Sequence, residues 1–371
     1  MQIYGSVQGR DAVEAKGEFM RAWPPSLNPH ESGIRKVSEH PEHGILVLAY
    51  GHKRYHRQAH TLALSLQRHS PGLHRTLVTD DGNCRAAEMY DDVIEMGAAQ
   101  SDDCRQKLYL DRYAPYPSTL YLDADAIAVR PVEPVFDLFD ASDIGVVGRD
   151  ITPTEESAWY GDVASMCVKA NSTWLPKCNS GLMLIRPSDT TRKVFDRARQ
   201  LANGYDELGL HPFRRGIADE PLLAMALAES GIHAQDLTAI TSATPIGISG
   251  PLQLDVLNGE CAFAKNGTKV APVLIHFAAD YSSDYRLAGA PYRRERCALR
   301  LAQHRHITDT TARIIADLRY GLQCAAFNTW IRIAGRAPRD PSGVFDEPRR
   351  RSTSPMAISG TKQPSAQEKT T

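Results

Sequence analysis

The sequence lacks the features that mark several other classes of protein. Its seven cysteines include no Cys-x-x-Cys pair, which argues against a zinc ribbon and, with their odd number, against a disulfide framework. The formal net charge is −1, so no overall field attracts nucleic acid or an anionic membrane, and phosphate binding has to be local. The longest apolar runs, such as residues 45–49, are too short to cross a bilayer. We therefore expect reduced thiols, no nucleic-acid partner and no transmembrane segment.

The two ends of the chain contain few long apolar stretches. Residues 1–43 are polar, are interrupted by prolines and carry no run of the signal-peptide kind. We predict an irregular leader there and a cytoplasmic location. Residues 336–371 are dominated by Pro, Ser, Arg and Thr, and their few apolar groups cannot offset the entropy of ordering. This segment is predicted to be a disordered tail.

What the chain does contain is the pattern of one large α/β domain over residues 44–290. Hydrophobic residues make up 42% of the 371 residues, as in soluble globular proteins. Residues 44–49 form a continuous apolar run, typical of a strand buried on both faces of a parallel sheet. A helix with apolar residues at helical spacing follows, and then a short strand at 76–79. This βαβ order predicts a central, mostly parallel sheet flanked by helices.

Further elements are predicted along the rest of the chain. Strands are expected at 93–96, 119–122 with a continuation at 127–129, 144–147, 182–185 and 273–277. Helices are expected at 104–113, at 191–202 with an N-cap at Ser188, Asp189 or Thr190, and at 219–230 with Gly231 in the C′ position.

Residues 291–335 are predicted to be a C-terminal helical extension in which arginines alternate with apolar residues. We favour a helix that packs its apolar residues on the larger domain and leaves its basic face in water. A free apolar face beside the arginines would instead suit an anionic acceptor or an anionic lipid surface.

The central chemical feature is Tyr121-Leu122-Asp123-Ala124-Asp125, at the end of an apolar strand. If the strand breaks there, the two carboxylates can meet one hard cation. Mg²⁺ or Mn²⁺ suits such oxygen ligands and keeps substrate phosphate in its shell. Ligands of open α/β sheets also sit outside the carboxyl ends of strands. An isolated Asp-x-Asp is a weak motif, and a solvated loop is its alternative interpretation.

Other polar residues follow or precede predicted strands and helices. His276 closes the strand at 273–277 and is either a third metal ligand or a hydrogen-bonded core histidine. Asn179 and Ser180 supply neutral groups for sugar hydroxyls, and Gly181 allows close backbone approach, although the tripeptide also suits an ordinary turn. Asp219 and Glu220 open a helix, where the macrodipole favours acids in any case. Lys107 lies in a helix and could equally belong to a solvated face.

Taken in their order along the chain, these motifs resemble those of the GT-A glycosyltransferases. The resemblance is strongest to the glycogenin-like and bacterial galactosyltransferase-like group called glycosyltransferase family eight. The resemblance covers roughly residues 44–280 and implies a Rossmann-like nucleotide-diphospho-sugar transferase fold. It depends on Ala49-Tyr50, on Lys107 upstream of Tyr-Leu-Asp-Ala-Asp, on Asn-Ser-Gly-Leu-Met-Leu-Ile, on Asp219 opening a helix, and on His276-Phe277.

The resemblance implies a role for each matching residue. The nucleoside pocket would be lined by Ala49, Tyr50 and Asp80. The donor sugar or its phosphates would also meet Lys107, Ala124 and Gly181. Mn²⁺, or Mg²⁺, would be held by Asp123, Asp125 and His276. The transferred sugar would be held near its anomeric carbon by Asn179, Ser180 and Asp219, which makes these the expected catalytic residues.

The sequence departs from the family pattern at two places. The family usually continues His-Phe with a Gly two residues on and then a Lys that grips the diphosphate, whereas this chain has Ala278-Ala279-Asp280. Arg286 is the candidate substitute for that Lys. The usual Asp-Gln is Asp219-Glu220 here.

The resemblance implies metal-dependent transfer of a sugar from a nucleotide-diphosphate sugar, a UDP-sugar in the first instance, to an acceptor hydroxyl with retention of configuration. A nucleotide-sugar-binding protein without transfer activity and a sugar nucleotidyltransferase stay as alternatives. A sugar nucleotidyltransferase normally has a Gly-rich loop after its first strand. Tyr50-Gly51-His52, which follows the first strand here, is not Gly-rich. The acceptor, whether saccharide, protein or small molecule, is left open, as is a homodimer.

Overall fold

The computed structural model describes residues 41–96, 104–139, 142–155, 157, 159–210 and 216–334. The predicted tail at 336–371 and the predicted leader, apart from residues 41–43, lie outside the described residues.

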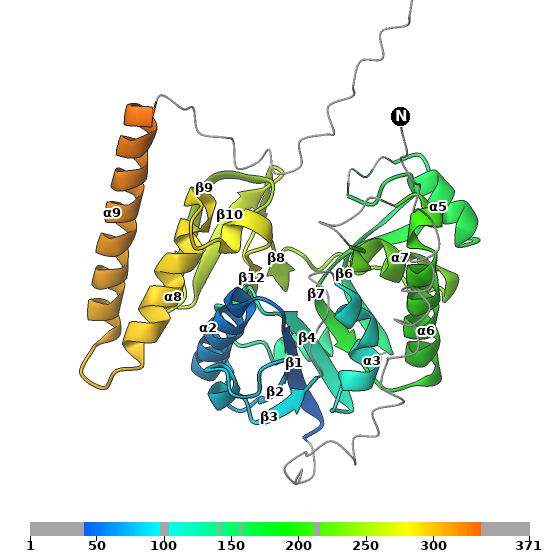
Figure 1. Cartoon of the computed structure of the whole chain (residues 1–371), viewed down its shortest axis with the longest axis horizontal. Coiled ribbons are helices and arrows are strands. Elements are labelled where there is room, and N and C mark those ends of the chain that lie inside the picture. Colours follow the sequence, from blue (N-terminus) through cyan, green and yellow to red (C-terminus); the bar gives the residue numbers. More distant parts are fainter. Residues whose placement is uncertain are drawn as a thin grey trace, which may run out of the picture.

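A six-stranded sheet forms the centre of the structure (Figure 1). Its order is β3-β2-β1-β4-β7-β6. The first four strands are parallel, and β4, β7 and β6 pair antiparallel. The bounds are β1 His43–Ala49, β2 His74–Thr79, β3 Asp92–Glu95, β4 Ser118–Asp123, β6 Ile144–Ile151 and β7 Leu175–Ile185. The predicted α/β architecture with a mainly parallel sheet is confirmed.

Helices cover both faces of this sheet, and β1 shows why. Alternate residues of a strand point to opposite faces. Ile45 and Val47 lie in one apolar cluster with residues of α2, Lys53–His69. Leu46 and Leu48 lie in a second cluster with residues of α6, Asp189–Asn203, and α7, Asp219–Glu229. The continuous apolar run of β1 therefore reflects burial on both sides.

The helix termini follow the predicted capping pattern. Ser188 caps α6, since its side chain accepts a hydrogen bond from the Thr191 amide. Gly231 follows α7 with a φ of 71°, the left-handed conformation that ends helices. The predicted helix at 104–113 is a 3-10 turn, η2, at Arg105–Tyr109 followed by α3 at Leu110–Tyr113.

The predicted continuation of β4 through residues 127–129 is wrong. The chain leaves the main sheet after Asp123, and β5, Ala126–Ala128, pairs antiparallel with β12, Leu274–His276. The short strand β8, Ser242–Ala243, pairs with the other edge of β12. The predicted break at the two aspartates is therefore real, but it transfers the chain to a second sheet.

Asn179, Ser180 and Gly181 also differ from prediction, because they lie inside β7 and not in a turn before it. Residues 175–178 pair with β6, residues 182–185 pair with β4, and residues 183–185 also pair with β6. The tripeptide thus lies between the two paired parts of β7.

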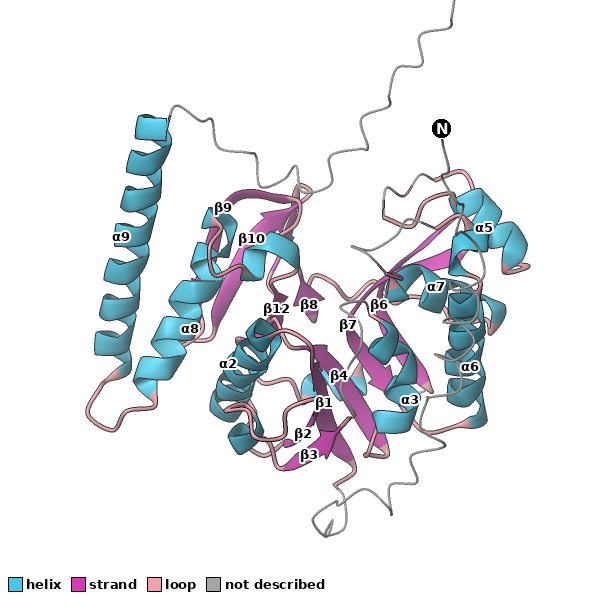
Figure 2. Cartoon of the chain, in the orientation of Figure 1, coloured by secondary structure: helices cyan, strands magenta, loops and turns pink. Residues whose placement is uncertain are grey.

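A third sheet was not predicted at all: β9 Ile248–Asp255, β10 Glu260–Lys265 and β11 Thr268–Val270 form an antiparallel meander (Figure 2). Half of the residues of β9 are exposed, and the strand contains Gly250 and Pro251. Such a strand has neither a buried run nor a clean alternation to reveal it.

The remaining short elements connect these layers. They are η1 Ala87–Met89, α4 Pro134–Asp137, α5 Val163–Lys169, η3 Tyr205–Leu208, η4 Ala279–Ser282 and η5 Leu287–Gly289.

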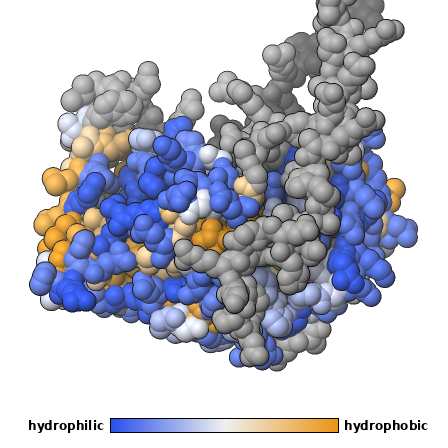
Figure 3. Space-filling model, turned by 60° about the horizontal axis from the view of Figure 1, so that its bottom comes forward, coloured by the Kyte–Doolittle hydropathy of each residue, from blue (hydrophilic) through white to orange (hydrophobic). Residues whose placement is uncertain are grey.

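Two helices, α8 Ala290–Ala302 and α9 Asp309–Ala334, occupy the region predicted to be helical after residue 291. The favoured arrangement of α9, with its apolar side packed, is wrong in the described residues. Ile314, Leu318 and Leu322 are 54%, 65% and 72% exposed, and apolar surface gathers at the α9 edge of the molecule (Figure 3).

Arg313 of α9 instead points inward, to the fully buried Glu295 at 2.8 Å and to Asp255 at 2.5 Å. Arg294 also pairs with Glu295, at 2.7 Å, and Ala312 and Ala316 of α9 are fully buried. These two small residues and Arg313 therefore form the side of α9 that faces the protein. Within the described part of the chain, the helices do not combine the length and apolar composition needed to cross a membrane.

Candidate metal and donor site

The predicted site residues gather at the carboxyl ends of neighbouring parallel strands. Asp123 at the end of β4 lies opposite Leu48 of β1, and Ala49 lies opposite Thr79 of β2. Asp80 follows Thr79 directly. The expected nucleoside residues and the expected metal ligands therefore share one edge of the sheet, where open α/β sheets bind ligands.

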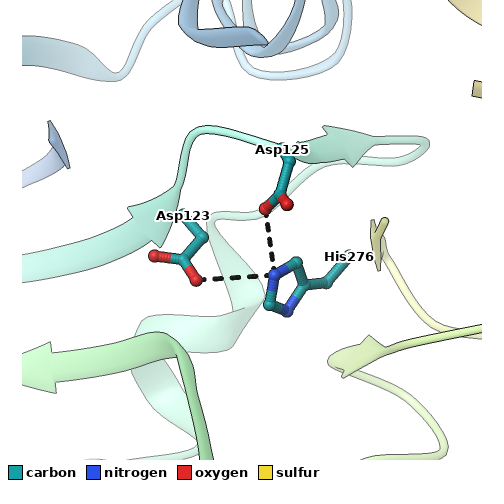
Figure 4. A group of neighbouring side chains, drawn as sticks. All are labelled: Asp123, Asp125 and His276. Carbon is teal, nitrogen blue, oxygen red and sulfur yellow. Dashed lines mark ion pairs between the residues drawn. The ribbon is translucent and has the colours of Figure 1, made fainter. Parts of the chain in front are cut away.

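Asp123, Asp125 and His276 point toward one another from two separate segments (Figure 4). One ligand atom from each lies within 4.8 Å of the others. His276 Nε2 is 3.0 Å from Asp125 Oδ1 and 3.4 Å from Asp123 Oδ2. Two carboxylates and one imidazole form a donor set that suits a divalent cation such as Mn²⁺ or Mg²⁺.

The β5–β12 pairing brings His276 to the aspartates. His276 lies opposite Ala126 in the ladder, and the Phe277 amide donates a hydrogen bond of 3.1 Å to the Asp125 carbonyl. Because this link involves only the backbone, it sets the position of His276 independently of the charges. The break after β4 and the end of β12 thus form one structural unit.

Asn179 determines which nitrogen of His276 faces the carboxylates. Asn179 Oδ1 accepts a 2.8 Å hydrogen bond from the Gly181 amide and lies 3.1 Å from His276 Nδ1. An amide oxygen only accepts, so Nδ1 carries the proton. In a neutral imidazole the lone pair is then on Nε2, toward Asp123 and Asp125, as a metal ligand requires.

Gly181 is required by the same histidine. A Cβ placed on Gly181 would lie 2.5 Å from Cε1 and Nδ1 of the His276 ring, closer than carbon atoms approach without displacement. Gly181 was predicted to contact the donor. The position of the His276 ring independently excludes a larger residue there.

The electrostatics of the metal-free group favour an ion pair. Burial opposes charge on His276, but Asp125, with Asp123 beyond it, outweighs that cost and raises the pKa of His276 above its ordinary value. Burial likewise opposes charge on Asp125, and His276 lowers the pKa of this carboxyl. The two carboxylates therefore stabilise positive charge at this position, as they would for a bound cation.

Lys107 connects the metal group to the expected sugar-binding residues. Its Nζ is 2.8 Å from Asp123 Oδ1, 3.1 Å from Ser180 Oγ and 3.6 Å from Asp219 Oδ2. Burial alone would lower the pKa of Lys107, but Asp123 and Asp219 hold it well above its ordinary value. Lys107 is thus a fixed positive charge between residues that the sequence separates widely.

Asp219 is buried at the start of α7, with 4% of its surface exposed. Its Oδ2 makes no hydrogen bond within the described residues, although it faces Lys107. A buried carboxylate oxygen with spare acceptor capacity can receive a hydroxyl group of a bound molecule. Asn179, Ser180, Lys107 and Asp219 are therefore brought together as the sequence predicted.

The residues expected to line the nucleoside pocket lie at the ends of β1 and β2. Asp80 Oδ2 accepts a 2.8 Å hydrogen bond from the Gly51 amide, and its Oδ1 is 3.0 Å from His56 Nε2. Tyr50 is half-buried and Ala49 is buried. The side chain of Ala124 is buried in the apolar cluster below the strand ends, so a donor contact from this residue would come from its backbone.

The segment after His276 keeps a special backbone despite its altered sequence. Ala279 has a φ of 56°, a left-handed conformation that glycine adopts without penalty, and it stands where the family pattern has Gly. Arg286, the candidate substitute for the phosphate-gripping Lys, is largely exposed, and its Nε is 3.9 Å from Asp280 Oδ2.

Sequence reasoning missed several side-chain contacts of the site. The Tyr121 hydroxyl donates a 2.5 Å hydrogen bond to Asp123 Oδ1, and the Ser282 hydroxyl lies 3.4 Å from Asp125 Oδ2. Glu220 accepts from the Ser180 amide at 3.0 Å and from Trp159 Nε1. Tyr121 immediately precedes the Asp-x-Asp segment and could have been proposed, whereas nothing in the sequence pairs Trp159 with Glu220.

Comparison with known proteins gives no match to a protein-family model and no match to a curated protein. Among solved structures, the glycosyltransferase GlyE of Streptococcus pneumoniae is 20% identical, with a TM-score of 0.36 over 53% of this chain and 46% of GlyE. This chain thus spans less than half the length of GlyE.

Two further solved structures show likeness over more of their own length. The galactosyltransferase LgtC, solved with donor and acceptor sugar analogues, is 14% identical, with a TM-score of 0.42 over 64% of this chain and 87% of LgtC. Mouse xyloside xylosyltransferase 1 is 15% identical, with a TM-score of 0.37 over 54% of this chain and 87% of that protein. All these likenesses are weak in both sequence and superposition.

Proposed function

We propose that this chain is a glycosyltransferase of the GT-A type, similar to family eight. It transfers a sugar from a nucleotide-diphosphate sugar, with UDP-sugars as the first candidates, to an acceptor hydroxyl. The observation that carries the proposal is the group of Asp123, Asp125 and His276 beside the carboxyl ends of β1 and β2. We propose residues 44–290 as the catalytic unit, with α8 and α9 as an extension.

A divalent cation, Mn²⁺ or Mg²⁺, would be held by these three residues and would neutralise the charge that develops on the leaving diphosphate. Asn179 and Gly181 keep His276 in the ligand orientation. Lys107, Ser180 and Asp219 hold the transferred sugar, and Tyr50 with Asp80 accommodates the nucleoside.

The proposed reaction breaks the bond between the anomeric carbon and the phosphate oxygen. The acceptor oxygen forms the new bond to the anomeric carbon on the same face, and its proton passes to the departing diphosphate. Same-face attack is favoured because the sequence offers no obvious covalent nucleophile, and the family resemblance implies retention.

The test is a screen for nucleoside diphosphate release from a panel of UDP-sugars and other nucleotide sugars, with water taking the place of the acceptor hydroxyl, in the presence of Mn²⁺, of Mg²⁺ and after chelation. Metal-dependent release of nucleoside diphosphate is the expected result. Release of pyrophosphate on incubation with a sugar phosphate and a nucleoside triphosphate would assign a nucleotidyltransferase instead. Thermal stabilisation by a nucleotide sugar without product would assign a binding protein that has lost transfer activity.

A further inference from the structure

The ladder of β7 is interrupted in its middle. Residues 175–178 pair with β6 and residues 182–185 pair with β4, whereas neither of these two described strands pairs with residues 179–181. Ser180 lies in this interval and is only 2% exposed. Because a buried amide without an acceptor is costly, the backbone of this interval needs hydrogen-bond partners other than a neighbouring strand.

Side chains supply those partners. The Gly181 amide donates to Asn179 Oδ1 at 2.8 Å, and the Ser180 amide donates to Glu220 Oε1 at 3.0 Å. Glu220 comes from the first turn of α7, so this contact ties the start of that helix to the middle of β7. The second oxygen of Glu220, Oε2, accepts a hydrogen bond from Trp159 Nε1. Glu220 therefore takes the place of a ladder partner for Ser180.

The position of Ser180 matters for the donor site. Ser180 Oγ is 3.1 Å from Lys107 Nζ, which is also 2.8 Å from Asp123 Oδ1 and 3.6 Å from Asp219 Oδ2. Asp219 directly precedes Glu220 at the start of α7. The contact between Glu220 and the Ser180 amide thus locates the Ser180 hydroxyl, and the same helix turn locates the Asp219 carboxyl.

We propose that Glu220 is a positioning residue of the donor site, whose carboxylate holds Ser180 so that its hydroxyl meets Lys107. This inference rests on the proposed glycosyltransferase function and adds a residue that controls how its donor site is assembled. Both partners of Glu220 donate, so the side chain has to present an acceptor oxygen to each. An ionised carboxylate does so, whereas an amide or a protonated carboxyl carries a hydrogen-bond donor on one side.

The surroundings of Glu220 make its protonation accessible in ordinary buffers. Burial, and then the neighbouring Asp219, raises the pKa of Glu220 to about 7, against the opposing effects of the Ser180 amide, Lys107 and Trp159. Tyr160 and Cys178 also face this carboxyl, and burial raises the pKa of each, so both stay neutral near pH 7. The carboxylate is therefore present above about pH 7, and its contact with one of the two donors is lost as the pH falls through this value.

The contact itself can be tested in the full chain by NMR of the indole N–H groups. The Trp159 signal is the one that Trp159→Phe removes. We expect its proton chemical shift to change with pH in a single step with a midpoint near 7, as Glu220 titrates. Glu220→Gln mimics the protonated form and should lack this step. A wild-type Trp159 signal without a step between about pH 6 and about pH 8 would overturn the proposal.

The positioning role is tested by kcat/KM for release of nucleoside diphosphate from the donor found in the screen, at saturating Mn²⁺. Wild type and Glu220→Gln are compared at each pH, so that the titration of groups common to both proteins cancels. The ratio of wild type to variant should be about tenfold at about pH 8.5, the scale of one hydrogen bond to an ionised acceptor, and should fall toward about 1 near pH 5.5. A purely structural role would give a ratio that does not change with pH, and this result would refute the proposal.

Two further variants show whether the effect passes through Ser180. Glu229→Gln makes the same substitution at the other end of α7, where the exposed carboxylate pairs with Arg197 at 2.7 Å, and its ratio should stay near that of wild type at every pH. In a Ser180→Ala background, the effect of Glu220→Gln should shrink, because the hydroxyl that the contact positions is gone. An undiminished effect in that background would overturn the role assigned to Ser180.

Failure of this inference is distinguishable from failure of the proposed function. Release of diphosphate with a wild-type to Glu220→Gln ratio near 1 at every pH would remove the positioning role and keep the transferase. Absence of release from every donor, with the NMR step intact, would remove the transferase and the role at its donor site together, and would leave Glu220 as a structural contact of β7.

Discussion

Replacing Asp125 by Asn should reduce activity far more than stability. The amide keeps the size of the side chain but removes one of the two negative charges in the group with Asp123 and His276. A unit charge about 4 Å away is worth about 4 kcal/mol at an effective dielectric constant near 20. Asp125 keeps 19% of its side chain exposed, so solvent screens part of this. We expect at least about 2.7 kcal/mol at the transition state, or a loss of about 100-fold in turnover.

The effect on folding should be smaller. The variant loses the contact of 3.0 Å between Asp125 and His276, which we expect to cost about 1–3 kcal/mol, while the backbone link from Phe277 to residue 125 remains. Thermal unfolding of the metal-free variant should therefore stay cooperative with a moderate loss in Tm.

The assay is release of nucleoside diphosphate at a saturating concentration of Mn²⁺, using the donor identified in the screen. Asp137→Asn, which changes an exposed carboxylate on α4, is the matched control and should behave as wild type. Turnover of Asp125→Asn close to that of the control, with the same metal requirement, would show that Asp125 is a loop residue without a metal-binding role.

Four further predictions follow from individual contacts. Gly181→Ala should weaken Mn²⁺ binding about tenfold or more, because the added Cβ displaces His276. Gly72→Ala is the control, since a Cβ there meets no atom within 4 Å, and equal Mn²⁺ affinities of the two variants in a metal titration would contradict the prediction. Ala279→Gly should stabilise the protein by about 0.5–1 kcal/mol, because glycine adopts the φ of 56° without the strain that alanine has there. Ala278→Gly, at a φ of −58°, should destabilise it, and the free energies of unfolding in denaturant compare the two variants. Leu318→Gln with Leu322→Gln should change the free energy of unfolding by less than about 0.5 kcal/mol because both are exposed, whereas Ala316→Gln, at a fully buried position, should destabilise the protein clearly. Deleting residues 336–371 should leave Tm unchanged, since this segment contains few apolar side chains to bury, and a large drop on truncation would refute that reading.

Much of the fold could be predicted from local sequence patterns. The buried run at 44–49, the helical spacing after it and the caps at Ser188 and Gly231 each report a local preference that the structure retains. The same holds for the break at Asp123 and Asp125, because two charged side chains cannot continue a strand buried on both faces. The meander at 248–270 was missed, since β9 has three exposed residues in a row and an internal Gly and Pro, which leave little periodic signal.

The sequence by itself determined the alternation of strands and helices and the residue types available for a cation. Only the tertiary structure decided which of them meet. His276 reaches Asp125 because β5 leaves the main sheet to pair with β12. Glu220 meets Trp159 because the start of α7 packs against β7. Arg313 pairs with the buried Glu295, which also contacts Arg294, and the larger apolar residues Leu318 and Leu322 of α9 are exposed. Each outcome depends on a contact between residues distant in sequence, whose energy no local pattern contains.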